Sequence, residues 1–175
     1  MRTLQTARLT LEPQCAVHAA AMFAVLSDPA IYEFEGRPPP SLAALSEGYR
    51  RSESRVSRDG LGKLLNWIVR LPSDELAGYV QATVLESGAA YVGYEFSKKH
   101  WGRGIGSASV QAVLEELVQS YGVHTVVAVL KPVNVRSMGL LGRLGFEPAT
   151  PPEAAAYESD PDEVVMLKVL REACL

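Results

Sequence analysis

The sequence is poor in the residues that build disulfide frameworks and metal sites. Its 175 residues include two cysteines, Cys15 and Cys174, near opposite ends of the chain, and three scattered histidines. Two such distant cysteines suggest no disulfide framework, and the histidines lack metal-ligand spacing. We therefore expect a cytoplasmic protein without a bound metal, in which His18, His100 and His124 are surface or packing residues.

The chain also lacks excess positive charge and long apolar runs. The formal net charge of −3 argues against a general nucleic-acid binder. No apolar run approaches the roughly 20 residues that cross a bilayer, and the first residues, MRTLQTARLTLEP, lack the apolar core of a signal peptide. Since the chain shows no linker or internal repeat, we expect one globular domain over residues 1–175.

The hydrophobic pattern predicts a mixed α/β chain. Turn residues after positions 71 and 85 predict antiparallel neighbours. A strand, a glycine turn, a helix and a further β-branched strand form a βαβ unit, so that last strand pair should be parallel. Strands are predicted at 8–13, 64–71, 75–85, 89–97, 125–131 and 162–170, helices at 16–26, 41–58, 105–121 and 134–144, and loops at 31–40 and 148–161.

The stretch HWGRGIGSAS, residues 100–109, places three glycines immediately before a predicted helix. Backbone N–H groups from about Gly102 to Ser107 can converge there on one anion, and the helix dipole favours negative charge. Arg103 adds a cation, and a pyrophosphate suits such a cradle. The alternative is that the glycines only make a tight connection between strand and helix.

Three common glycine motifs do not match this turn. No Gly-Lys-Ser/Thr occurs, so the lysine of a P-loop is missing. The third glycine of a dinucleotide-binding fingerprint is replaced by Ser107 or Ser109, and the next strand ends in Lys131 instead of an acid. The nucleophile elbow G-x-S-x-G is also absent.

The segment WGRGIG, residues 101–106, resembles the acetyl-coenzyme A signature Q/R-x-x-G-x-G/A of the GNAT N-acetyltransferases. Its tryptophan is typical of the ribosomal-protein alanine acetyltransferase (Rim-type) branch. The resemblance covers nearly the whole chain in order. It is carried further by ARLTLEP, LSDPAI, GYEFSKKHWGRGIGS, the N-x-x-S element Asn134–Ser137 and the L-G-F element Leu144–Phe146.

This resemblance implies the GNAT fold, in which a mostly antiparallel twisted sheet contains a splayed parallel strand pair and is flanked by helices. It also implies direct transfer of an acetyl group from acetyl-coenzyme A to a primary amine in a ternary complex. The pantetheine would lie between strands 91–97 and 125–130. The implied cofactor-binding residues are Phe96, Trp101, Gly102, Arg103, Gly104, Ile105, Gly106, Ser107 and Asn134.

Direct attack needs a neutral amine, and Glu95 is the first candidate for its general base. Glu33 and Glu35 are alternatives, and Glu95 could instead face outward as a surface carboxylate. The tyrosine with which many GNAT enzymes protonate the leaving sulfur is replaced here by Leu141. Ser137 matches the serine of the Rim-type branch, so the resemblance assigns it to the sulfur, although Asn134 and Ser137 could equally form a helix cap.

The acceptor stays open between a protein N-terminus and a small-molecule amine, and so does the choice between monomer and homodimer. A second interpretation is a non-catalytic acyl-coenzyme A sensor or a partner-binding module. Aromatic residues that could line an acceptor pocket are Tyr32, Phe34, Tyr49, Trp67 and Tyr79.

Overall fold

The fold is built on one eight-stranded sheet, with strand order β1-β2-β3-β4-β5-β6-β8-β7. A computed structural model of the chain describes residues 1–34, 36–57, 60 and 62–170. Every neighbouring pair in the sheet is antiparallel except β5 and β6, which are parallel. The strands are β1 (Leu4–Gln5), β2 (Thr10–Pro13), β3 (Gly62–Arg70), β4 (Leu76–Leu85), β5 (Ala89–Phe96), β6 (Thr125–Leu130), β7 (Glu147–Pro148) and β8 (Val164–Val169).

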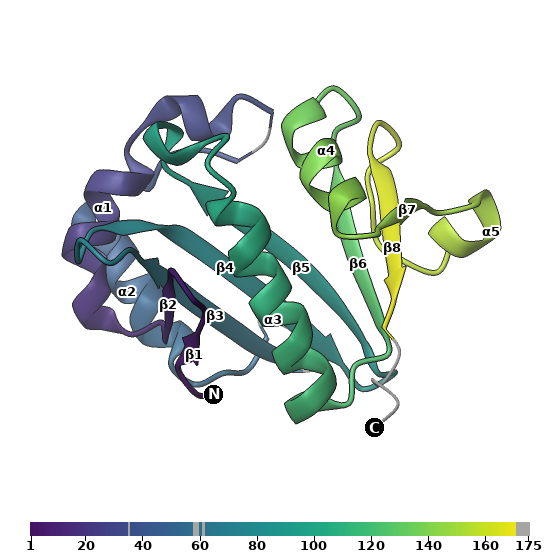
Figure 1. Cartoon of the computed structure of the whole chain (residues 1–175), viewed down its shortest axis with the longest axis horizontal. Helices are drawn as coiled ribbons and strands as arrows, with labels where there is room; N and C mark the ends of the chain where they lie inside the picture. The colour runs from purple at the N-terminus through teal and green to yellow at the C-terminus, as the bar shows by residue number, and fades with distance from the viewer. Residues whose placement is uncertain (35, 58–59, 61, 171–175) are drawn as a thin grey trace.

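Helices cover both faces of this sheet. Helix α3 (Ile105–Tyr121) crosses one face, whereas α1 (Ala19–Leu26) and α2 (Leu42–Ser52) lie against the other (Figure 1). The alternation of β3 serves both layers, because Trp67 and Val69 join the core under α3 while Ile68 joins the core under α1 and α2. The remaining helices are α4 (Val135–Arg143) and α5 (Pro151–Ala154), with 3₁₀-helices at Ala16–His18, Pro29–Tyr32 and Lys98–His100.

The predicted fold class is confirmed, including the antiparallel run β3-β4-β5 and the parallel pairing of β5 with β6. The helix predicted over 41–58 is too long, because α2 ends at Ser52. The following residues bond to β3 instead. Leu64 N–H donates to Arg55 O, and Ser57 N–H donates to Gly62 O. The sequence also suggests Asp59-Gly60 as the stop of this helix; residue 59 lies outside the described residues, and Gly60 has φ of +77°.

Other differences from the predicted elements are short. The helix predicted from residue 16 begins with a 3₁₀ turn, and the predicted loop 31–40 contains the end of another at Tyr32. The predicted loop 148–161 holds α5 and the end of β7, and the two-residue β1 has no counterpart in the prediction.

The three histidines lie at packing and surface positions, as predicted. His18 is buried and contacts Glu12, and His100 is buried with its Nε2 3.0 Å from Glu75 Oε1, while His124 is exposed. Among the described residues, no group of three His, Cys, Asp or Glu side chains is placed to hold a metal ion. Within the residues that the structure describes, no helix has the length and apolar character needed to cross a membrane.

Glu12 anchors β2 to β3 and leads to a prediction about stability. Its carboxylate accepts hydrogen bonds from Arg70 Nε at 2.7 Å and Arg70 Nη2 at 2.9 Å, and it is 25 % exposed. Chiefly these bonds, with a further one from His18, hold the pKa of Glu12 below its usual 4.5. A carboxylate with a lowered pKa stabilises the folded state above about pH 4.5, and this contribution is lost as the pH falls through the folded-state pKa.

We therefore expect Glu12→Gln to lower the free energy of unfolding by about 1–2 kcal/mol at neutral pH. The difference from wild type should shrink at acid pH below the folded-state pKa of Glu12, where the native carboxylate is also neutral. Urea denaturation at neutral and at acid pH measures this difference in the free energy of unfolding. Glu86→Gln, which changes an exposed carboxylate between β4 and β5, is the control. A gap that stays the same at low pH would mean that Glu12 acts through packing and not through charge.

Candidate active site

The glycine turn between β5 and α3 has the backbone geometry that its sequence predicts. Gly102 and Gly104 have φ of +73° and +78°, a left-handed conformation that favours glycine. A Cβ added at either position meets no atom within 4 Å in the part of the chain that the structure describes, so the space beside the turn is open. Since α3 begins at Ile105 and no side chain of the described residues caps it, the N–H groups of its first turn can bind an anion.

Gly106 has a different role from the other two glycines. A Cβ there would lie 2.8 Å from Leu140 Cδ1 and 3.4 Å from Phe96 Cε2. Gly106 therefore lets α3 pack closely against α4 and β5. The three glycines combine an open anion cradle with close packing behind it, which is more than a tight connection requires.

Strands β5 and β6 separate beside this turn. They pair only at three positions, Ala89 with Thr125, Ala90 with Val126 and Tyr91 with Val127. Between residues 92–96 and 128–130 no pairing of these two described strands continues, although β5 stays paired with β4. The separation lies along a cleft of about 790 Å³, whose lining includes Tyr94, Phe96, Gly104, Ser107 and Val129.

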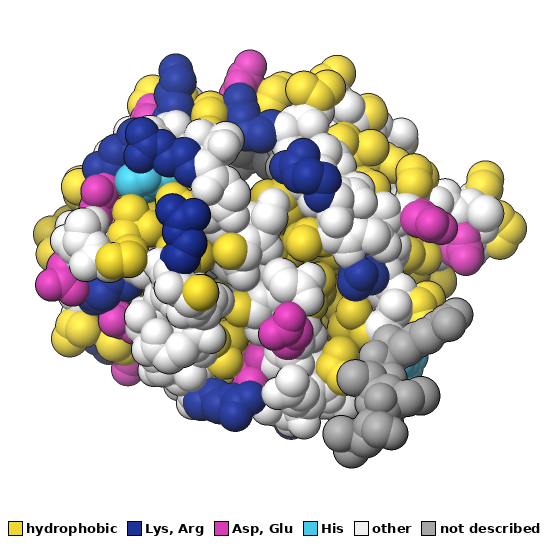
Figure 2. Space-filling model, in the orientation of Figure 1, with side chains coloured by type: hydrophobic (Ala, Val, Ile, Leu, Met, Phe, Trp, Pro, Cys, Tyr) yellow, Lys and Arg dark blue, Asp and Glu magenta, His cyan; other side chains and the backbone are white. Residues whose placement is uncertain are grey.

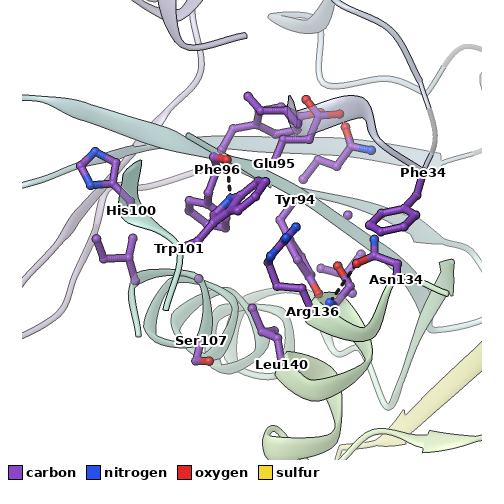
Figure 3. Close-up of a pocket in the computed structure, with 18 of the residues that line it drawn as sticks. Phe34, Tyr94, Glu95, Phe96, His100, Trp101, Ser107, Asn134, Arg136 and Leu140 are labelled. Carbon is purple, nitrogen blue, oxygen red and sulfur yellow. Dashed lines mark hydrogen bonds between the residues drawn. The ribbon is translucent and has the colours of Figure 1, made fainter. Parts of the chain in front are cut away.

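One aromatic and one basic side chain, Trp101 and Arg136, are in contact at this cleft. Trp101 Nε1 donates a hydrogen bond to Phe96 O at 2.9 Å, which fixes the indole over the end of β5. The guanidinium of Arg136, from α4, lies 3.5 Å from the centre of the Trp101 ring, and Figure 3 shows the two side chains stacked. Arg136 is a candidate site residue that the sequence does not single out, because its only signal there is its place inside the N-x-x-S element.

Cationic side chains surround the mouth of the cleft. Lys and Arg side chains gather near the beginnings of α3 and α4 on the face seen in Figure 2. Arg103, Arg136 and Arg143 are exposed, and the last two line the cleft itself. Positive charge at this mouth complements a polyanionic ligand such as one carrying several phosphates.

Asn134 and Ser137 lie together at the start of α4 and both line the cleft. Asn134 Oδ1 accepts a hydrogen bond from Ser137 N–H at 3.1 Å, so the predicted helix cap is present. The Ser137 hydroxyl is not needed for this cap and is available to the cleft. Leu141, at the position of the family's tyrosine, is 1 % exposed and packs in the core.

Glu95 points into the interior of the site and is not a surface carboxylate. Figure 3 shows it on the opposite side of β5 from Tyr94. Burial, the charge of Glu95 and hydrogen bonding with Glu95 raise the pKa of Tyr32 and Tyr79, and burial and the same charge raise the pKa of Tyr49. These three phenols therefore stay protonated around the Glu95 carboxylate.

A second cavity of about 760 Å³ lies on the α1 and α2 side of the sheet. It meets the first cleft at Gly36, Tyr79, Gln81 and Glu95, which line both. Tyr32 and Tyr49 also line it, so three of the five aromatic residues proposed for an acceptor pocket lie together here. Glu95 thus stands where the two cavities meet.

The other sequence candidates lie elsewhere. Phe34 lines the first cleft, and Trp67 is fully buried in the core, so the expectation that Trp67 lines a pocket is wrong. Glu33 is exposed and lines neither cavity. Glu35 lies outside the described residues.

Comparisons with known proteins agree with this architecture. Residues 8–147 match the family model described as acetyltransferase (GNAT) domain. An uncharacterized N-acetyltransferase p20 from Bacillus licheniformis is 28% identical over 149 residues, which are 84% of this chain and 83% of that protein. The [ribosomal protein uS5]-alanine N-acetyltransferase of Escherichia coli is 36% identical over 59 residues, only 34% of this chain and 30% of that protein.

A solved structure extends the match in three dimensions. The RimL ribosomal L7/L12 alpha-N-protein acetyltransferase, in complex with coenzyme A, superposes with a TM-score of 0.79 at 20% identity. The superposition covers 96% of this chain and 98% of that one. At this level of identity the match shows the fold alone.

Proposed function

Because the chain belongs to the acetyltransferase (GNAT) domain family, we propose that it is an acetyl-coenzyme A-dependent N-acetyltransferase that acts on a primary amine. The observation that carries the proposal is the junction of the two cavities at Glu95. A cleft suited to a long polyanionic cofactor and a second cavity share this carboxylate in their lining.

The residues around the first cleft fit acetyl-coenzyme A. The turn from Gly102 to Ser107 offers backbone N–H groups to the pyrophosphate, and Arg136 and Arg143 offer charge to the phosphates. The separated edges of β5 and β6 offer backbone groups to the pantetheine amides. Bound acetyl-coenzyme A supplies the acetyl group as a thioester, whose sulfur would lie towards Ser137.

The chemistry is direct transfer. In the proposed step Glu95 takes a proton from the attacking amine, directly or through one water, as the new C–N bond forms and the C–S bond breaks. A backbone N–H near Phe96 stabilises the negative charge that develops on the carbonyl oxygen. The Ser137 hydroxyl hydrogen-bonds the leaving sulfur, which takes up a proton from solvent to become the thiol of coenzyme A, and Glu95 returns the amine proton to solvent.

We further propose a protein N-terminus or a comparable α-amine as the acceptor. An α-amine has a pKa of about 8, whereas a lysine amine has about 10.4. The first therefore needs only modest help from one carboxylate at neutral pH. The partial likeness to an alanine N-acetyltransferase supports the same class. An acyl-coenzyme A sensor would need no second cavity at Glu95, so the open junction favours an enzyme.

The test is acetyl transfer by the purified protein. With saturating acetyl-coenzyme A and a panel of primary amines, we expect coenzyme A release detected with a thiol reagent and a matching acetylated product detected by mass spectrometry. Binding of acetyl-coenzyme A, measured separately by calorimetry, distinguishes the two interpretations. Tight binding with no product from any amine would favour the sensor, and no binding would contradict both.

A further inference from the structure

The second cavity carries an uneven distribution of charge. Among the described residues that line it, the formally charged side chains at neutral pH are Arg37, Arg51 and Glu95. Glu95 lies at the junction with the first cleft, whereas Arg37 follows the 3₁₀ turn at Tyr32 and Arg51 is on the last turn of α2. The inner end of the cavity is therefore anionic, and its outer part is cationic.

Neither arginine is strongly neutralised by its neighbours. Arg37 is exposed and has no ion-pair partner in the part of the chain that the structure describes. Arg51 is 68 % exposed and lies 3.9 Å from a Glu47 oxygen, at the limit of an ion pair, while Arg50 makes the closer contact with Glu47. Both guanidinium groups thus keep donors for an anion at the cavity.

The inner end of the cavity offers acceptors for N–H groups. Asn66, on β3, is only 7 % exposed, and its buried Oδ1 has no hydrogen-bond partner among the described residues. It lines the same cavity as Glu95. A buried acceptor without a donor costs about 1–3 kcal/mol, so a ligand N–H that reached Asn66 would remove this cost. The phenols of Tyr49 and Tyr79 supply further polar contacts beside it.

From this arrangement we propose that the acceptor is an acidic amine, a primary amine that carries a carboxylate, with its nitrogen at Glu95 and Asn66 and its carboxylate at Arg37 and Arg51. The inference rests on the proposed function for the chemistry at Glu95. Its own content is the preference for a negative charge beyond the amine. The carboxylate comes either from the acceptor amino acid itself or from acidic side chains that follow an N-terminal residue.

Matched acceptors distinguish these two sources. Alanine compared with alaninamide tests the α-carboxylate. Alanyl hexapeptides whose second and third residues are two aspartates, two asparagines or two lysines test the side chains. We compare kcat/KM from coenzyme A release, and we measure binding of labelled peptides to the coenzyme A complex by fluorescence anisotropy, so that a preference is seen even without turnover.

We expect the acidic member of at least one set to be favoured by about five-fold to ten-fold in kcat/KM or in affinity, the range that two exposed ion pairs provide. The preference should fall to about two-fold at roughly 0.5 M salt. Arg37→Gln and Arg51→Gln should each reduce it. Arg8→Gln removes the same charge from an exposed residue outside both cavities and should leave it unchanged.

The outcomes separate this inference from the proposed function. Acetylation that favours neutral or basic acceptors, or that keeps an acidic preference in both arginine variants, overturns the inference and leaves acetyl transfer standing. Selective binding of acidic peptides that Arg37→Gln weakens, with no turnover, supports the inference and contradicts the proposed function. If neither turnover nor selective binding is observed, the inference is overturned.

Discussion

Replacing Gly104 by aspartate should abolish binding of acetyl-coenzyme A, with a loss of about 100-fold or more in affinity. The new carboxylate would stand in the open space beside the glycine turn, where we place the pyrophosphate. Two like charges about 4 Å apart near a protein surface repel by about 4 kcal/mol. Since every 1.4 kcal/mol is ten-fold in affinity, this repulsion alone exceeds the expected loss.

Gly104→Asn is the matched control for this substitution. Asparagine is close to aspartate in size and also tolerates the φ of +78° at this position better than most side chains. It carries no charge, so we expect it to lose about ten-fold or less. Calorimetry on the three proteins separates the causes. Equal losses in both variants would mean that backbone geometry, and not anion binding, requires the glycine.

The glycine turn could be predicted from the sequence because its signal is local. Three glycines within five residues, followed by helical spacing, specify a left-handed turn and the start of a helix in one short segment. The antiparallel hairpins could also be predicted, since short turns between strands allow few alternative pairings. The helix predicted over 41–58 was too long because the tertiary contacts of Arg55 and Ser57 with β3 prevail over a locally helical pattern.

The acceptor cavity could not be predicted in the same way. Tyr32, Tyr49, Asn66, Tyr79 and Glu95 come from five segments that only the folded sheet and its helices bring together. The face on which Glu95 lies was ambiguous, because alternation along a strand does not say which side faces a site. The contact between Arg136 and Trp101 likewise joins α4 to the glycine turn across the cleft. The local sequence pattern does not predict it.

Glu95→Gln should lower kcat/KM for the amine acceptor by about 100-fold or more at neutral pH, the scale on which general bases act. Glutamine keeps the size of the side chain and can still bond the tyrosines around it, but it cannot take up the proton. We expect the affinity for acetyl-coenzyme A to change by about two-fold at most, because the glycine turn and α4 hold that ligand. Initial rates and calorimetry check the two expectations independently.

The pH profile shows whether Glu95 acts as a base. An α-amine with a pKa of about 8 deprotonates on its own as the pH rises, so the variant should regain activity by about ten-fold per pH unit until that pKa is passed. Glu33→Gln, an exposed carboxylate outside both cavities, is the control and should behave as wild type. If the Glu95→Gln deficit stayed the same across this pH range, the carboxylate would be positioning the amine or the tyrosines and would not be accepting the proton.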